Sequence, residues 1–233
     1  MNNKDSLGNR MKDYENVSRN YLTKRTPVIV RVDGRAFHTL TRKCEKPFDG
    51  RLIKSMVAAA TRVAQDMQGF KLAYVQSDEA SFLITDYDDV NTQGWFDYNL
   101  SKIISLSSSI MSVEFNNNFS YGKLGYFDSR AFNIPEKDIA NYFLWRSKDW
   151  ARNSLQMYCR EFFSHKELNY IRKEGMHELL HGVGKNWATD LTPQERNGTF
   201  IYKGGVSMEE LCDVKPKYEG IRRIVEKIMT NPI

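Results

Sequence analysis

Cysteine is scarce in this sequence and shows no pattern of pairing. The 233 residues include 3 cysteines, which are Cys44, Cys159 and Cys212. An odd number of widely spaced cysteines without a Cys-x-x-Cys pair argues against a disulfide framework and against a zinc ribbon. We therefore expect free thiols, a reducing compartment and a cytoplasmic location.

Long apolar runs and metal-binding histidine motifs are missing as well. No run of about 18 apolar residues occurs, so we expect no membrane-spanning helix. The polar N-terminal segment lacks the apolar centre of a signal peptide. His177 and His181 are spaced i, i+4 on one helix face, but no third ligand accompanies them, which favours a structural role over a metal site.

Repeats, low-complexity tracts and Pro/Gly-rich linkers are also absent, and the remaining composition is that of an ordinary globular protein. Hydrophobic residues account for 41% and charged residues for 27% of the chain, and a chain of this length can bury a sizeable core without disulfide bonds. The 34 Lys and Arg residues exceed the 29 Asp and Glu residues, which gives a net charge of +5. That excess suits an RNA partner, because phosphates attract cations, and it suits a basic enzyme without nucleic acid equally well.

Apolar periodicity predicts an α+β arrangement. Helices are expected over 11–24, 49–68, 95–115 and most of 136–164, and strands over 28–33, 70–75, 80–85, 125–134 and 198–206. The two strands that flank the polar tip 76–79 predict a hairpin. The order predicts an antiparallel sheet with helices on one face, followed by a mostly helical C-terminal half. We expect a catalytic core over 1–135 and a helical region over 136–233 packed on it, with one continuous domain as the alternative.

Two carboxylates occur where apolar β runs meet turns. Asp33 ends the run that begins at Val28, and Asp78 lies at the tip of the hairpin. Neighbouring strands are about 4.8 Å apart, so pairing of the two runs would bring these acids together. Such a pair repels unless a cation lies between its members, and Mg²⁺ prefers oxygen ligands while it leaves room for substrate phosphates. A second ion about 3.5–4 Å away would complete a two-metal site for phosphoryl transfer.

The turn after the first strand offers backbone groups for the same chemistry. Gly34 lets the backbone approach a metal or a phosphate closely, and the N–H groups of residues 35–38 could bind phosphate oxygens. A plainer interpretation also exists, because Asp-Gly is a common turn after a strand and Ser77-Asp78-Glu79 can be a solvated hairpin tip. Spacing alone leaves both interpretations open.

Four segments, in order, resemble the motifs of one enzyme family. They are Arg31-Val32-Asp33-Gly34-Arg35-Ala36-Phe37-His38, Lys46-Pro47-Phe48-Asp49-Gly50-Arg51, Tyr74-Val75-Gln76-Ser77-Asp78-Glu79-Ala80-Ser81-Phe82 and Phe127-Asp128-Ser129-Arg130. The family is the tRNA(His) guanylyltransferases and their bacterial and archaeal relatives, which extend RNA in the 3′–5′ direction. The resemblance covers roughly residues 11–205, and several ordered motifs are far more specific than one.

This resemblance implies a palm-like catalytic core, similar to that of polymerases and nucleotide cyclases, in a Mg²⁺-dependent nucleotidyltransferase. It implies two Mg²⁺ ions held by the carbonyl of Gly34 and by the side chains of the two catalytic residues, Asp33 and Asp78. It also implies that ATP and GTP or another NTP bind to motif residues: Asp33, Gly34, Arg35, Ala36, Phe37, His38, Lys46, Asp49, Ser77, Asp78 and Lys102. Lys46 and Asp49 would lie near the activating nucleotide, and Lys102 would contact a triphosphate.

One segment departs from the family pattern. Where the tRNA(His) enzymes carry His-Ile-Asn-Asn after a Trp-Arg-x-x-Asp segment, this chain has Ala151-Arg152-Asn153-Ser154. The difference indicates the like-protein branch, which is similar to enzymes that repair truncated tRNA 5′ ends by templated addition. Arg130, Arg152 and Asn153 are the candidate RNA contacts from the motif match, and each could instead be a structural arginine or a cap.

The expected function is therefore template-dependent addition of nucleotides to the 5′ end of tRNA. The alternatives are a tRNA(His) guanylyltransferase proper, a palm-fold nucleotide cyclase and an RNA-binding module without catalysis. Trp145 and Trp150 could stack on bases, although aromatic residues at this helical spacing are more often core. The resemblance implies tRNA and nucleoside triphosphates as partners, no membrane, and a homotetramer built as a dimer of dimers.

Overall fold

An antiparallel sheet forms the centre of the molecule. The computed structural model describes residues 6–120 and 122–230, and within these residues six strands form one sheet in the order β4-β1-β3-β2-β5-β6. The strands are β1 (Val28–Gly34), β2 (Phe70–Gln76), β3 (Glu79–Ile84), β4 (Phe127–Asn133), β5 (Thr199–Gly204) and β6 (Ser207–Leu211). The predicted strands and the α+β class are confirmed, and β6 is a strand that the sequence did not indicate.

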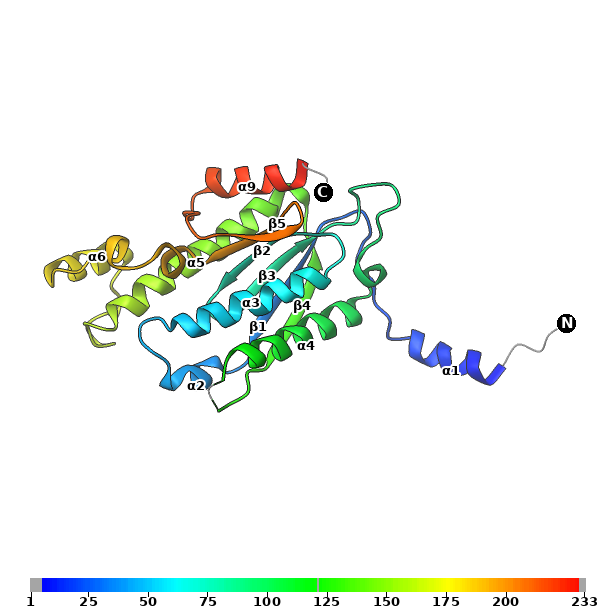
Figure 1. Ribbon diagram of the computed structural model, residues 1–233, viewed down its shortest axis with the longest axis horizontal. Coiled ribbons are helices and arrows are strands. Elements are labelled where there is room, and N and C mark those ends of the chain that lie inside the picture. The colour runs from blue at the N-terminus through cyan, green and yellow to red at the C-terminus, as the bar shows by residue number, and fades with distance from the viewer. Residues whose placement is uncertain (1–5, 121, 231–233) are drawn as a thin grey trace.

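Long helices cover both faces of this sheet (Figure 1). The N-terminal half supplies α3 (Gly50–Asp66) and α4 (Leu100–Asn118) to one face, as predicted, and the C-terminal half supplies α5 (Ile139–Cys159) and α9 (Tyr218–Thr230) to the other. The shorter elements are α1 (Ser6–Asn16), α2 (Phe37–Leu40), α6 (Lys173–Gly182), α7 (Trp187–Asp190) and α8 (Pro193–Asn197), with 3₁₀ turns at η1 (Thr41–Lys43), η2 (Trp95–Tyr98) and η3 (Glu136–Asp138). No helix among the described residues is long and apolar enough to cross a membrane.

Strand alternation builds a separate core on each face of the sheet. Val28, Val30 and Val32 of β1 pack into the cluster beneath α3 and α4, whereas Ile29 packs into the cluster beneath α5 and α9. Because successive side chains of a strand point to opposite faces, the next odd-numbered residues of β1 also face α5. This alternation directs Arg31 and Asp33 towards the C-terminal half.

The C-terminal half contributes strands to the sheet as well as helices that pack on it. The expected division near residue 135 falls between β4 and η3, and the sheet continues beyond it because β5 pairs with β2 and β6 pairs with β5. A smaller apolar cluster links the end of α5 to α6, through Leu155, Cys159, Met176 and Leu180. All three cysteines are free thiols, as expected.

Two predicted helices have different boundaries. The helix expected over 11–24 is α1, which ends at Asn16, has no buried residue and projects away from the sheet (Figure 1). The chain after α1 is extended because long-range backbone bonds hold it, including Leu22 N to Tyr98 O and Leu100 N to Asn20 O. The helix expected over 95–115 begins only at Leu100, since Phe96 and Asp97 adopt left-handed φ values of 52° and 54°.

Candidate active site

The carboxyl end of β1 meets the turn between β2 and β3. β1 pairs with β3 in a register that places Asp33 opposite Glu79, and the N–H of Gly34 donates to the carbonyl oxygen of Asp78 at 2.9 Å. The backbone therefore holds Asp33 and Asp78 at one edge of the sheet, as the sequence led us to expect.

The two aspartates interact electrostatically at this edge. Burial raises the pKa of Asp78, and the negative charges of Asp33 and Glu79 raise it further. A carboxylate in such surroundings gains most from a cation or a proton placed beside it. This is the local condition that the predicted metal site requires.

A cavity of about 420 Å³ opens on one side of Asp78; we call it the apolar cavity. Its walls include Phe37 of α2, Phe48, Leu52 of α3 and Trp150 of α5, and the rings of Phe48 and Trp150 meet edge to face with centroids 6.0 Å apart. Its lining also contains most of the nucleotide-binding residues expected from the sequence, namely Gly34, Ala36, Phe37, His38, Lys46, Asp49, Ser77 and Asp78. A cavity with aromatic and aliphatic walls and several polar groups suits a nucleotide base and its phosphates.

A second cavity of about 410 Å³ lies on the other side of Asp78; we call it the charged cavity. Its lining contains cationic, anionic and neutral side chains. These residues are Arg31, Asp33, Gln76, Ser77, Asp78, Glu79, Arg146, Asp149, Trp150, Asn153, Gln156, Met157 and Arg160. Both cavities share Ser77, Asp78, Trp150 and Met157. The hairpin tip and the Trp150 indole thus form the wall between them.

Buried ion pairs support the hairpin tip from the α5 side. Arg146 donates two hydrogen bonds of 2.8 Å to the carboxylate of Glu79 and a third, of 3.1 Å, to Asp149. Arg31 pairs with the same Glu79 at 2.8 Å and reaches Asp33 at 3.4 Å. These arginines were not among the predicted site residues. The strand period of two, which puts Arg31 on the face of Asp33, was the available signal for one of them.

Asp49, expected near the activating nucleotide, lies in the wall of the apolar cavity and caps α3. Its carboxylate accepts bonds from the backbone N–H groups of Arg51 (2.9 Å) and Glu45 (3.1 Å) and from the Arg51 guanidinium (2.8 Å). The hydrogen bond from the Arg51 side chain is the main reason that the pKa of Asp49 lies far below its usual range. Because this carboxylate accepts hydrogen bonds from residues on both sides of it, it fixes the conformation of the loop that carries Lys46.

The charge of Asp49 should stabilise the fold in a pH-dependent way. Asp49→Asn keeps a capping oxygen but removes the charge, and we expect the free energy of unfolding to fall by about 1–3 kcal/mol at pH 7. Because the folded-state pKa is lowered, this contribution is complete above the unfolded-state value of about 3.9 and is lost as the pH falls below it. Denaturant unfolding of both proteins between pH 7 and pH 3 measures this, and a difference that does not shrink towards pH 3 contradicts it.

The turn after β1 has fewer free donors than the sequence suggested. The N–H of Gly34 is bonded to Asp78, and that of Arg35 donates to the carbonyl oxygen of Tyr126 at 2.8 Å. Arg35 is exposed and lines neither cavity. Ala36 adopts a left-handed φ of 55° immediately before α2, whose first N–H groups have no partner within the helix. Residues 36–38 are therefore the donors that remain for a phosphate.

Close packing at Gly34 leaves no room for a side chain. A Cβ at this position would collide with the Phe37 ring and would lie 2.9 Å from the Cβ of Asp78. We expect Gly34→Ala to lower the free energy of unfolding by about 1–3 kcal/mol and to lower nucleotide addition by more than about tenfold. Gly50→Ala is the control, because nothing lies within 4 Å of its Cβ. Equal thermal stability of the two variants would contradict this expectation.

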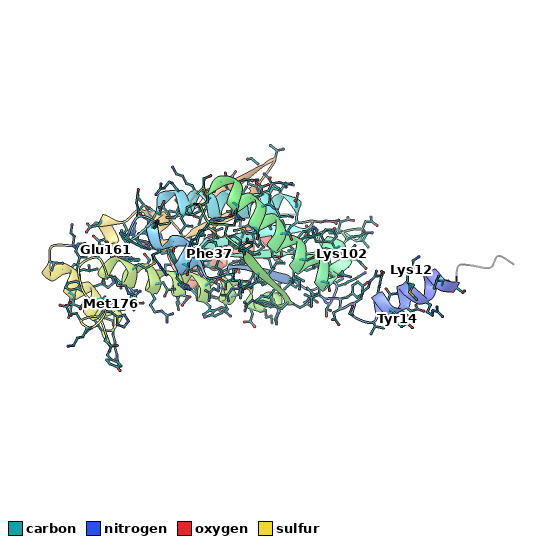
Figure 2. The ribbon with its side chains drawn as sticks, turned by 90° about the horizontal axis from the view of Figure 1, so that it is seen from below. Lys12, Tyr14, Phe37, Lys102, Glu161 and Met176 are labelled. Atoms are coloured by element: carbon teal, nitrogen blue, oxygen red, sulfur yellow. The ribbon has the colours of Figure 1, made fainter. Side chains whose placement is uncertain are left out.

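Lys102, expected to contact a triphosphate, lies apart from both cavities. Figure 2 shows it towards the end of the molecule from which α1 projects, away from Phe37. The N–H of Phe127 donates to the hydroxyl of Ser112 in α4, and Phe127 pairs with Gly34. Ser112 is therefore the residue of α4 that lies beside the site. Lys102 lies ten residues before it, which is about 15 Å along the helix axis. Its ammonium lies 5.8 Å from the centre of the Phe96 ring.

The candidate RNA contacts are divided between the site and the surface. Asn153 lines the charged cavity. Arg152 is exposed and pairs with Asp149 within α5, and Arg130 is exposed on the edge strand β4. Trp150 is only 5% exposed, so its indole is available to a ligand only through the cavities it lines.

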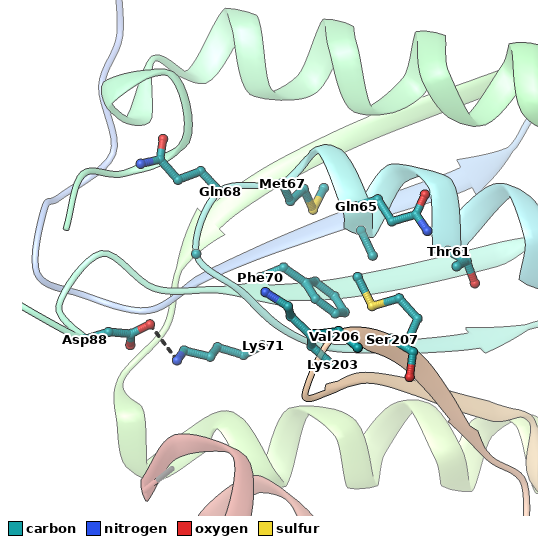
Figure 3. Close-up of a pocket in the computed structure, with 13 residues that line it drawn as sticks. Thr61, Gln65, Met67, Gln68, Phe70, Lys71, Asp88, Lys203, Val206 and Ser207 are labelled. Carbon is teal, nitrogen blue, oxygen red and sulfur yellow. Dashed lines mark hydrogen bonds and ion pairs between the residues drawn. The ribbon is translucent and has the colours of Figure 1, made fainter. Parts of the chain in front are cut away.

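A third cavity, of about 650 Å³, lies between the end of α3 and the β5–β6 turn. Figure 3 shows that the ammonium of Lys71 points towards Asp88, which also lines this cavity, and the two form an ion pair of 2.7 Å. None of the predicted site residues lines this cavity. We therefore assign the candidate active site to the two cavities at the hairpin tip.

Comparison with known proteins agrees with this fold and site. The family model described as Thg1, tRNAHis guanylyltransferase, matches residues 8–135. A probable tRNA(His) guanylyltransferase from Dictyostelium discoideum is 30% identical in an alignment of 200 residues, and the match covers 76% of this chain and 75% of that protein. The structure of a bacterial tRNA(His) guanylyltransferase-like protein in complex with ATP is 37% identical and superposes with a TM-score of 0.89, covering 97% of this chain and all of that one.

More distant comparison supports the fold. The crystal structure of tRNA(His) guanylyltransferase from Saccharomyces cerevisiae, at 22% identity, covers 86% of this chain and 93% of that one with a TM-score of 0.73. The bacterial relative was also solved in complex with GTP. The family model spans more than half of this chain, and its match includes β1, the β2–β3 hairpin and β4. The chain belongs to the tRNAHis guanylyltransferase family of nucleotidyltransferases.

Proposed function

We propose that this protein adds nucleotides to the 5′ end of tRNA in a template-dependent, Mg²⁺-dependent reaction that repairs truncated 5′ ends. The observation that carries the proposal is the position of Asp78 in the wall shared by the two cavities, with Asp33 in the lining of the charged cavity. A reaction that joins two substrates needs two neighbouring binding sites with the reacting atoms between them. The ATP and GTP complexes of the bacterial relative support nucleoside triphosphates as substrates.

The donor set fits Mg²⁺. Among residues 6–120 and 122–230, no three His, Cys, Asp or Glu side chains converge on one point, so a metal cage built only of side chains is absent from that part of the chain. Mg²⁺ is commonly held by one or two carboxylates together with substrate phosphates and water, which matches Asp33, Asp78 and the carbonyl of Gly34. When bound, Mg²⁺ would acidify the attacking hydroxyl and neutralise the charge that develops on the phosphate.

In the proposed reaction, a 5′-monophosphate of RNA first attacks the α-phosphorus of ATP and releases pyrophosphate. The 3′-hydroxyl of an incoming NTP then attacks the activated 5′ phosphorus and releases AMP; a 5′-triphosphate end would need no activation and would release pyrophosphate.

The apolar cavity binds the base of the nucleotide, and His38 and Lys46 in its lining bind phosphate oxygens. The charged cavity receives the RNA 5′ end, with Asn153 as one contact. Watson–Crick pairing to the opposite strand selects the nucleotide.

The segment that departs from the tRNA(His) enzymes favours repair over guanylylation of tRNA(His). Ala151 is 4% exposed and Ser154 is fully buried, and the hydroxyl of Ser154 accepts a bond from the Trp187 indole at 3.0 Å. Neither residue presents a group that could read an anticodon. We therefore propose that specificity comes from the template strand.

The test is an assay of purified protein with full-length and 5′-truncated tRNAs, with each NTP and with or without Mg²⁺. We expect templated addition to truncated tRNAs that stops in EDTA. Addition of G to full-length tRNA(His) alone would support the guanylyltransferase proper, and cyclic products from NTPs alone would support a cyclase. Light scattering of the same sample tests the proposed homotetramer.

A further inference from the structure

Two buried polar atoms whose side chains line one small cavity beside the hairpin tip have no protein partner among the described residues. They are Oε1 of Gln76 and Nε1 of Trp150, and each residue is only 5% exposed. A buried donor or acceptor without a partner destabilises the fold. Native proteins satisfy most such groups with protein or with ordered water.

Both side chains line one small cavity. Its volume is about 20 Å³, and a cavity needs only about 10–15 Å³ of such volume to hold one water molecule. Its other polar side chains are those of Ser77, Thr199 and Gln194, and the last two already bond to each other at 2.8 Å. The remainder of the wall is mainly apolar and includes Ile53, Met56, Val57 and Val75.

We propose that this cavity binds one structural water, which accepts from the Trp150 indole and donates to Gln76 Oε1. The hydroxyl of Thr199 supplies a third partner, and buried waters typically make about three hydrogen bonds. The site adds to the proposed reaction, because it would hold a solvent molecule and no substrate, in a cavity that shares Ser77 and Trp150 with the two substrate cavities.

The water would make Gln76 and Trp150 positioning residues. Gln76 is the last residue of β2 and directly precedes Ser77 and Asp78. Trp150 belongs to α5 and forms the wall shared by the apolar and charged cavities. A bridge between them ties the hairpin tip to α5 and fixes the indole against the bound base.

The first experiment observes the water directly and needs no activity. In an ¹⁵N-labelled sample, the indole signal of Trp150 is identified by its loss in Trp150→Phe, and we expect it to show cross-relaxation with a long-lived water. The indole of Trp187, assigned with Trp187→Phe, is the control because its N–H bonds directly to Ser154 at 3.0 Å. A wild-type crystal structure should show density within hydrogen-bonding distance of both atoms. Absence of both signals overturns the proposal, whatever reaction the protein catalyses.

The second experiment tests positioning. Gln76→Met removes the acceptor at similar volume, and we expect it to abolish the water signal and to raise KM for the nucleotide about three- to tenfold with kcat nearly unchanged. Trp150→Phe should raise KM similarly, and the double variant should not be worse than either single one. A fully additive double variant, or loss of kcat alone, would overturn the positioning role. This readout rests on the proposed function, whereas the water signal does not.

Discussion

Asp78→Asn is expected to reduce nucleotide addition by at least about a thousandfold, which corresponds to about 4 kcal/mol of transition-state stabilisation. Burial and the charge of Asp33 already disfavour a second negative charge at this position, so the carboxylate is retained at an energetic cost. A carboxamide removes the charge that would hold a divalent cation while it keeps nearly the same shape. Asp33→Asn should have a comparable effect.

The controls for this variant separate chemistry from folding and binding. Asp66→Asn changes an exposed acid at the far end of α3 and should leave the rate of addition unchanged. The affinity of Asp78→Asn for a nucleotide without metal, measured by titration of tryptophan fluorescence, should change less than about tenfold, since the apolar cavity remains. If the variant adds nucleotides at a rate near that of the wild type, Asp78 has no part in the mechanism.

Glu79→Leu is expected to lower the free energy of unfolding by about 3–5 kcal/mol, because it removes the carboxylate that the buried Arg146 and the partly buried Arg31 share. Glu79 is 5% exposed, and Arg146 is also 5% exposed. Loss of a pair on the surface costs far less, typically below about 1 kcal/mol. The effect should therefore be visible as a large drop in the midpoint of urea unfolding.

Glu226→Gln is the matched control for that experiment. It breaks the exposed Arg222–Glu226 pair of α9, in which the two side chains are 49% and 54% exposed, and should change stability by less than about 1 kcal/mol. Glu79→Gln should be intermediate, because an amide oxygen can still accept from one arginine. Equal stability of the Leu variant and the wild type would show that the buried pairs contribute nothing net.

The sequence predicted best the features that depend on neighbours in the chain. The β2–β3 hairpin, the Asp49 cap of α3 and the position of Asp33 at the end of β1 follow from alternation, turn residues and capping chemistry. Once β1 pairs with β3, Asp33 and Asp78 must lie at the same edge. Local rules therefore predicted the arrangement of the two acids, and the resemblance to a known family supplied their proposed role.

Features that depend on distant partners were missed or misplaced. Arg146 and Glu79 are 67 residues apart in the chain, so no local sequence pattern predicts their ion pair. The extended chain after α1 is held by backbone bonds to residues 98 and 100, which override the helical periodicity of 11–24. Lys102 matched a family lysine in sequence, and it lines neither cavity; its contact with a triphosphate stays a prediction.

The turn that carries Asp78 contains only two residues between β2 and β3. Because the side chains of a strand alternate with a period of two, adding or deleting one residue in β2, β3 or their turn would reverse the faces of every later side chain in the hairpin. After such a change in β2, Glu79 would face away from Arg31 and Arg146, with which it pairs in the present register. Family members can therefore vary in residue type along this hairpin, but insertions and deletions should be excluded from it.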